Sequence, residues 1–237
     1  MNHPYNQEYF EKGTISNYRG YSDLPYFELL AREIFLLFRP NRVLEVGCAK
    51  GYVVKHLRSL GVKAFGVDIS KYAVSRANKE VKAYLQVAKV QKLPFPDDYF
   101  DVVFSLDLFE HIPEDELEKA IRESLRVGEI QFHLITTKEI VPDKDITHVT
   151  LKPLRWWKQK FEKFLNQSDQ ITPMLFLVES ENHWIHDFLK YYWLLKDQKK
   201  NIKGLNKELR EIYASRGWKA ISLLHQIRMS LPILRKL

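Results

Sequence analysis

Three segments in the first half of the chain combine residue types that could bind a ligand. In residues 45–51, the carboxylate of Glu45 precedes a run of small residues, which allow a sharp backbone turn and close approach of a ligand. Asp68 carries two carboxylate oxygens, each able to accept a hydrogen bond from one of two neighbouring ribose hydroxyls. Residues 105–111 end in Glu110 and His111, and a neutral imidazole can accept a proton from a reacting group.

Each of these segments follows an apolar run that predicts a β-strand. We expect strands at residues 42–46, 62–67, 83–87, 101–106 and 130–136, with a sixth at 174–178. Helical periodicity predicts helices at residues 24–38, 52–60, 71–81, 114–126 and 153–165. Asp23 and Ser70 are the expected N-caps of the first and third helices.

Alternating strands and helices predict an α/β fold with right-handed crossovers. The expected architecture is a Rossmann-like, doubly wound and mostly parallel sheet with helices on both faces. Ligands of such sheets bind beyond the carboxyl ends of the strands, where the three segments lie.

Composition divides the chain into three parts. Residues 1–23 are polar and aromatic and predict an irregular arm, residues 24–180 the α/β domain, and residues 181–237 a helical extension. Residues 190–237 carry twelve basic and three acidic side chains, a net charge of +9, whereas the rest of the chain sums to −2. A basic helical segment either contacts nucleic acid, an anionic membrane surface or an acidic protein partner, or is a solvated face.

Composition also excludes several classes. The chain has 237 residues with one cysteine, Cys48, which excludes a disulfide framework and a multi-cysteine zinc site. No apolar run is long enough to cross a bilayer, and the first residues lack the order of a signal peptide. We therefore expect a cytoplasmic protein; the oligomeric state is open.

Four segments, in order and spacing, resemble motifs of class I S-adenosylmethionine-dependent methyltransferases of the type 11-like group. Residues 45–51 resemble the glycine loop, 67–70 the second motif, 93–101 the loop before the fourth strand, and 109–112 the stretch after it. A single short glycine-rich loop is weak support, whereas four motifs in register are strong. The nicotinamide-binding alternative fits worse, because the glycine spacing differs from its pattern.

The resemblance implies S-adenosyl-L-methionine as cofactor and S-adenosyl-L-homocysteine as product. Glu45 would hold the methionine amino group, Asp68 the ribose hydroxyls, and Ile69 would pack on adenine. The implied cofactor contacts are Glu45, Gly47, Cys48, Ala49, Gly51, Asp68, Ile69, Lys89, Val90, Gln91, Ser105 and Leu106.

Two positions depart from the family pattern. Lys89 stands where an aspartate usually contacts the adenine amino group, so we expect weaker cofactor binding unless Gln91 substitutes. Residues 125–129 replace the usual Pro-Gly-Gly turn before the fifth strand.

The acceptor side is less defined by sequence. His111 and His148 are the candidate catalytic residues, each as a base or as a packing residue. Tyr18 and Tyr21 could form an N-terminal lid over the acceptor, or lie on the surface. His183 and His186 have a spacing that could chelate a metal, but solvated side chains are the expected outcome, so no metal site is predicted.

The function expected from these residues is methyl transfer to a small-molecule or sugar-containing (glycan-type) acceptor. Two alternatives stay open: an RNA methyltransferase that uses the basic extension, and a non-catalytic methyltransferase-like binding protein. Neither the acceptor nor the methylated element (oxygen, nitrogen or carbon) follows from the sequence, because acceptor pockets come from variable loops.

Overall fold

The computed structural model describes residues 4–12, 15–16, 20–137, 145–165 and 174–179. The chain divides into two compact units, residues 1–180 and residues 181–237. All described residues belong to the first unit, so the predicted helical extension, with its basic residues and with His183 and His186, lies outside them.

Apolar runs of the sequence form the strands of one six-stranded sheet. The strands are β1 (Arg42–Val46), β2 (Lys63–Asp68), β3 (Leu85–Val87), β4 (Phe100–Leu106), β5 (Gly128–Ile135) and β6 (Met174–Glu179). Their order is β3-β2-β1-β4-β5-β6, and all neighbours are parallel. The order reverses between β1 and β4, where an open α/β sheet leaves a crevice for ligands. The predicted α/β fold is confirmed.

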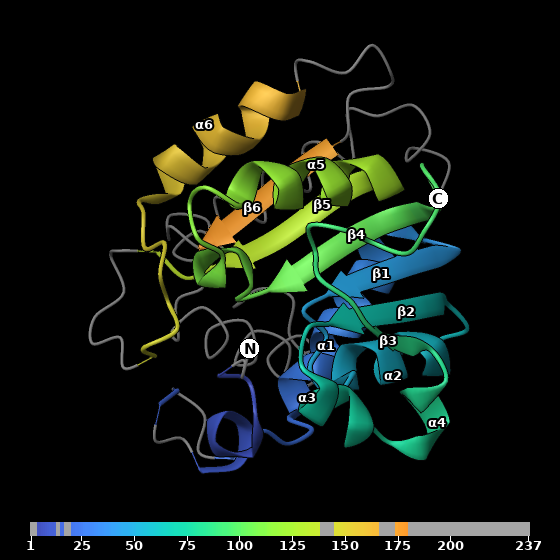
Figure 1. The fold of residues 1–237 in the computed structure, drawn as a ribbon. Helices are drawn as coiled ribbons and strands as arrows, with labels where there is room; N and C mark the ends of the chain where they lie inside the picture. The colour runs from blue at the N-terminus through green and yellow to red at the C-terminus, as the bar shows by residue number, and fades with distance from the viewer. Residues whose placement is uncertain (1–3, 13–14, 17–19, 138–144, 166–173, 180–237) are drawn as a thin grey trace, which may run out of the picture. The chain divides into compact units, whose positions relative to one another are not determined.

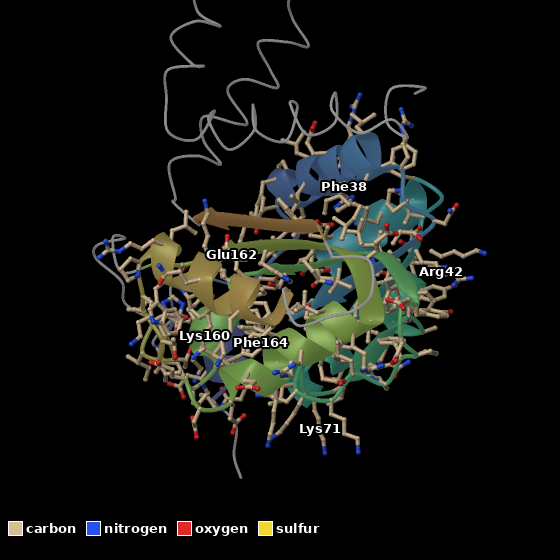
Figure 2. All side chains as sticks on the ribbon, turned by 90° about the horizontal axis from the view of Figure 1, so that it is seen from above. Phe38, Arg42, Lys71, Lys160, Glu162 and Phe164 are labelled. Carbon is tan, nitrogen blue, oxygen red and sulfur yellow. The ribbon has the colours of Figure 1, made fainter. Side chains whose placement is uncertain are left out.

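Helices cover both faces of this sheet, as Figure 2 shows. They are α1 (Pro25–Phe38), α2 (Tyr52–Ser59), α3 (Lys71–Ser75), α4 (Lys79–Lys82), α5 (Leu117–Val127) and α6 (Leu154–Leu165). Adjacent β5 residues show the two faces: Phe132 lies 6.5 Å from Phe38 of α1, and His133 lies 5.4 Å from Phe161 of α6, measured between ring centroids. None of the helices in the described ranges combines the length and apolar character that a membrane crossing requires.

Two details of the predicted helices are wrong. The helix expected at residues 71–81 is interrupted, because Asn78 begins a new helix by accepting a hydrogen bond from the backbone N–H of Glu80. Asp23 does not cap α1; its carboxylate pairs with Lys55 at 2.6 Å and His56 at 2.9 Å, on α2. Ser70 does cap α3, through a 3.0 Å hydrogen bond from the N–H of Ala73.

Residues 125–129, which replace the Pro-Gly-Gly turn of the family pattern, contain no loop between helix and strand. α5 ends at Val127 and β5 begins at Gly128. A Cβ atom at Gly128 would lie 2.5 Å from Cγ2 of Val103 and 2.9 Å from the carbonyl oxygen of Phe100. Position 128 therefore requires a glycine, because the backbone there lies directly against β4 and leaves no space for a side chain.

A buried polar network joins β4, α5 and β5. Nδ1 of His133 lies 2.9 Å from Oγ of Ser105, and Nε2 lies 3.2 Å from Oε1 of Gln131. Ser124 donates its hydroxyl to the same Gln131 oxygen at 2.7 Å. Burial lowers the pKa of His133 to about 3, so the imidazole is neutral near neutral pH.

We expect His133 to make the domain sensitive to acid. The unfolded imidazole binds a proton near pH 6.5, whereas the folded one does so only near 3, so the stability it contributes is lost as the pH falls below about 6.5. The expected loss is about 1.4 kcal/mol in the free energy of unfolding per pH unit. Urea denaturation of the wild type and of His133→Gln between pH 7 and 5 measures the difference in slope.

The wild type must be compared with His133→Gln because buried carboxyl groups with raised pKa change the free energy of unfolding with pH in the opposite direction. His56→Gln, on α2, should keep the acid-dependent loss since His133 is intact. Equal slopes for the wild type and His133→Gln would contradict the prediction.

Candidate functional site

The carboxyl ends of β1, β2 and β4 bring the sequence motifs together. Val46 is in register with Val67 on one side and with Ser105 on the other. The arrowheads of the three strands point to one side of the domain in Figure 1, where the N-terminal arm also lies. Residues 45–51, Asp68 and residues 105–111 therefore meet at one edge, as predicted.

The glycine-rich loop turns sharply after β1. Its backbone N–H groups at Gly47 and Cys48 donate to the carbonyl oxygen of Val67 at 2.8 and 3.0 Å. Gly51 has φ +74°, and a Cβ there would lie 2.6 Å from Cδ1 of Leu85. Ala49 adopts φ 47°, a left-handed conformation that costs a residue with a Cβ about 1–2 kcal/mol.

The carboxylate of Asp68 stabilises this loop. Its Oδ2 accepts a 2.7 Å hydrogen bond from the N–H of Ala49, and its Oδ1 accepts one of 2.7 Å from the N–H of Ser70. Burial raises the pKa of Asp68, and the two N–H groups oppose that rise. Each oxygen has a second lone pair, so the carboxylate can also accept hydroxyl groups of a ligand.

Glu45 places a second carboxylate at the base of the loop. The side chain is 3% exposed, and among the described residues its Oε2 has no hydrogen-bond partner. Burial raises the pKa of Glu45 well above its ordinary value; a backbone N–H of Val54 lowers it and the charge of Asp68 raises it further. A buried, unsatisfied carboxylate oxygen is costly, and an ammonium or N–H group of a ligand would satisfy it.

The other side chains predicted to contact the cofactor differ in how far they are exposed to a ligand. Ile69 and Leu106 are half-buried at this edge. Cys48 is buried, which raises the pKa of its thiol well above the usual range, and its backbone N–H donates to the carbonyl oxygen of Val67. The prediction that Ser105 faces the cofactor is wrong for its side chain, which is fully buried and bonded to His133.

The segment after β3 gives no replacement for the missing acidic residue. Lys89 is exposed and Val90 is packed in the core. The amide nitrogen of Gln91 donates to Oε2 of Glu116 at 2.7 Å, so this side chain is already engaged.

The N-terminal arm covers the edge of the site. Tyr9 and Phe10, in the π-helix η1 (Glu8–Lys12), pack with Ala49 of the glycine-rich loop and with Ala73. The carbonyl oxygen of Tyr5 accepts a 2.7 Å hydrogen bond from Ser70, and its ring lies 5.8 Å from that of His111. The arm thus bridges the glycine-rich loop with Ser70 on one side and His111 on the other.

Of the lid pair predicted from sequence, Tyr21 packs against the cluster of Tyr9, Phe10, Ala49 and Ala73. Tyr18 lies outside the described residues, and Tyr21 packs on Tyr52 at 5.4 Å. The sequence analysis did not predict that Tyr5, Tyr9 and Phe10 pack at the site. The one sequence signal for them was the concentration of aromatic residues in an otherwise polar segment.

Polar anchors hold the arm to the domain. Nζ of Lys50 lies 2.7 Å from Oε1 of Glu11 and donates to the carbonyl oxygen of Tyr21 at 2.9 Å. Lys50 is 8% exposed, which limits competition from water. The hydroxyl of Tyr9 donates to Oδ2 of Asp145 at 2.9 Å.

The two predicted catalytic histidines lie together although they are far apart in sequence. The rings of His111, at the end of the 3-10 helix η2 (Phe109–His111), and His148 are 4.5 Å apart between centroids. Nδ1 of His111 lies 2.8 Å from Oγ1 of Thr147. Glu110, which the sequence analysis left without a role, is buried beside them and accepts a 2.7 Å hydrogen bond from the N–H of Thr136.

Comparison with known proteins gives a family for part of this domain. Residues 44–131 match the family described as a methyltransferase domain. The chain is 29% identical over 123 residues to ajmaline N-methyltransferase of Rauvolfia serpentina, covering 48% of this chain and 42% of that protein. It is 34% identical over 96 residues to chloroplastic tocopherol O-methyltransferase of Arabidopsis thaliana, covering 37% and 27%. The chain thus spans less than half of the length of either relative.

A solved structure has the same fold. The crystal structure of a SAM dependent methyltransferase from Archaeoglobus fulgidus superposes with a TM-score of 0.51 at 20% identity, covering 64% of this chain and 71% of that one.

We expect the Lys50 anchor to control opening of the arm. Lys50→Met removes the ion pair to Glu11 and the hydrogen bond to Tyr21, so the arm should open more often. Limited chymotrypsin digestion, which tracks the open population, should cleave residues 4–21 about three- to tenfold faster. Lys63→Met, an exposed lysine at the amino end of β2, should leave the rate unchanged; a similar rate in both variants would refute the anchoring role.

Proposed function

We propose that residues 44–131, which match a methyltransferase domain, are a class I S-adenosylmethionine-dependent methyltransferase domain, and that the protein transfers the methyl group of S-adenosylmethionine to a small-molecule acceptor. Glu45, the loop 47–51 and Asp68 would hold the cofactor, with Ile69 on the adenine and Leu106 on the sulfonium side. S-adenosylhomocysteine would be the product.

The observation that carries this proposal is the pair of buried carboxylates at the ends of β1 and β2. Oε2 of Glu45 has no hydrogen-bond partner among the described residues, and both Asp68 oxygens have lone pairs left after their 2.7 Å bonds to the backbone. The amino group of the methionine part would satisfy Glu45, and the ribose hydroxyls would bind Asp68. One ligand with a cationic end and a diol accounts for both groups.

His111 and His148 would lie on the acceptor side of the cofactor in this proposal. Both are partly exposed, and both belong to segments at the carboxyl edge of the sheet. A small-molecule acceptor is supported by the relatives, whose names give an alkaloid and a tocopherol as substrates. A sugar-containing acceptor remains within the proposal, and nothing in the described residues favours the RNA alternative, since the basic extension lies outside them.

Calorimetric titration with S-adenosylmethionine and S-adenosylhomocysteine tests the cofactor site. We expect Asp68→Ala to weaken binding about 30- to 100-fold, which corresponds to the loss of two hydrogen bonds of about 1–1.4 kcal/mol each. Because Asp68 also stabilises the glycine-rich loop, Glu45→Gln provides a second variant of nearly unchanged shape, with an expected loss of about tenfold.

Glu129→Gln is the matched control, because this exposed carboxylate lies at the amino end of β5. It should bind as the wild type does. Absence of binding to the wild type would refute the proposal and favour a non-catalytic protein, with Lys89 as the reason.

Cofactor affinity should rise with pH. Burial raises the pKa of both Glu45 and Asp68, so a fraction of the protein molecules carries neutral carboxyl groups at mildly acidic pH. These groups must lose a proton to bind a cation. Titrations between about pH 5 and 7 should show tighter binding at each step, by up to about tenfold per unit for each proton released. Glu45→Gln should flatten this dependence; an unchanged slope would contradict the assignment of Glu45.

A further inference from the structure

A second group of potential ligands lies outside the cofactor contacts, at the end of β4. One carboxylate oxygen of Glu110 and one ring nitrogen each of His111 and His148 lie within 4.8 Å of one another. Bonds of about 2.1 Å to a common ion would place such atoms roughly 3–3.5 Å apart, so a small inward shift of side chains would complete the site. Two imidazoles and one carboxylate are a donor set typical of catalytic transition-metal sites.

An independent observation points to a ligand at Glu110. The side chain is fully buried, yet its Oε2 has no hydrogen-bond partner among the described residues, whereas Oε1 accepts the N–H of Thr136. Burial without a partner is costly for a carboxylate oxygen. A cation beside Oε2 would remove that cost.

The neighbours of His111 orient it as they do for histidines that bind metals. Oγ1 of Thr147 donates to Oδ1 of Asp145 at 2.5 Å, so its lone pair faces Nδ1 of His111 at 2.8 Å. Nδ1 therefore carries the proton, and the lone pair of the ring is on Nε2. A hydrogen bond from the second ring nitrogen, linked onward to a carboxylate, fixes the tautomer and the ring of a metal ligand.

The two carboxylates near the site are joined through one residue. Thr136 donates its N–H to Glu110 at 2.7 Å and its hydroxyl to Oδ1 of Asp107 at 3.1 Å. This arrangement concentrates two carboxyl groups at the carboxyl end of β4, beside the two histidines. A dication is the ligand that such a concentration favours.

We propose that Glu110, His111 and His148 bind a divalent transition-metal ion such as Zn²⁺, and that the ion's open position takes a hydroxyl group of the acceptor. The role of the ion rests on the proposed function, whereas its binding does not. Bound to the metal, the hydroxyl loses its proton to solvent more readily. The oxygen then forms a bond to the methyl carbon, and the electron pair of the broken carbon–sulfur bond stays on sulfur.

The position of the site agrees with this role. His111 follows β4, on the same sheet edge as the proposed cofactor contacts Asp68 and Leu106. Tyr5 contacts both regions, through Ser70 at 2.7 Å and through the His111 ring at 5.8 Å. The proposal therefore narrows the acceptor to a small molecule with a hydroxyl group.

Metal binding to the full chain, freed of metal with a chelator, tests the site without any methyl transfer. Titration with Zn²⁺ should give one ion per chain that is lost, by at least about a hundredfold in affinity, in Glu110→Gln, His111→Gln and His148→Gln. Thr147→Val should weaken binding about tenfold, because it removes the group that orients His111. Co²⁺ should give a visible absorption spectrum that the same variants change, and adding catechol as a hydroxyl probe should shift it.

Two control variants separate this site from other histidines. His56→Gln and the double variant His183→Gln/His186→Gln should keep the ion. Zn²⁺ affinity that survives all three ligand variants, or that disappears only in the double variant, would overturn the proposal. No change of the Co²⁺ spectrum with catechol would overturn the role in holding the acceptor.

Failure of this inference and failure of the proposed function are distinguishable. Asp68→Ala should weaken S-adenosylmethionine binding and keep Zn²⁺ affinity unchanged. Binding of the cofactor without Zn²⁺ would refute the metal site alone, and binding of Zn²⁺ without the cofactor would refute the methyltransferase function and with it the acceptor role of the ion.

Discussion

The hydrogen bonds of the Asp68 carboxylate connect the parts of the molecule on which the site depends. They join the end of β2 to the glycine-rich loop at Ala49 and to the start of α3 at Ser70. The loop in turn supports Tyr9 and Phe10 of the N-terminal arm. Because Ala49 is held in a left-handed conformation, the loop needs such an external partner to keep its shape. One buried carboxylate thus orders the loop, the helix and, through the loop, the arm.

The polar network inside the sheet and the two buried glutamates differ in how completely their hydrogen bonds are made. The network of Ser105, His133, Gln131 and Ser124 lies within the sheet and under α5, and its hydrogen bonds are made within the protein. Glu45 and Glu110 lie toward the carboxyl edge, and each retains an oxygen without a partner among the described residues. Since uncompensated burial of a carboxylate is costly, the two positions are where ligands would contribute most.

The two halves of the sheet edge offer different chemistry. The side of β1 and β2 presents carboxylates and backbone turns, which suit a ligand with an ammonium group and hydroxyls. The side of β4 presents imidazoles with a buried carboxylate, which suit a transition-metal ion. The arm contacts both sides through Tyr5, so one short segment covers the region where a cofactor and an acceptor would meet.

The sequence alone determined the alternation of strands and helices, the sheet type and the meeting of three motifs at the carboxyl edge of the sheet, because apolar periodicity and short motifs are local signals. The sequence analysis missed the break at Asn78, because it followed apolar periodicity and not the local capping bond to Glu80. It also missed the pairing of Asp23, which is set by side chains of another helix. Only the tertiary structure turned Ser105 to His133, placed Tyr5 and Tyr9 over the loop, and set His148 beside Glu110 and His111. These contacts join residues distant in sequence, and no periodicity within one segment encodes them.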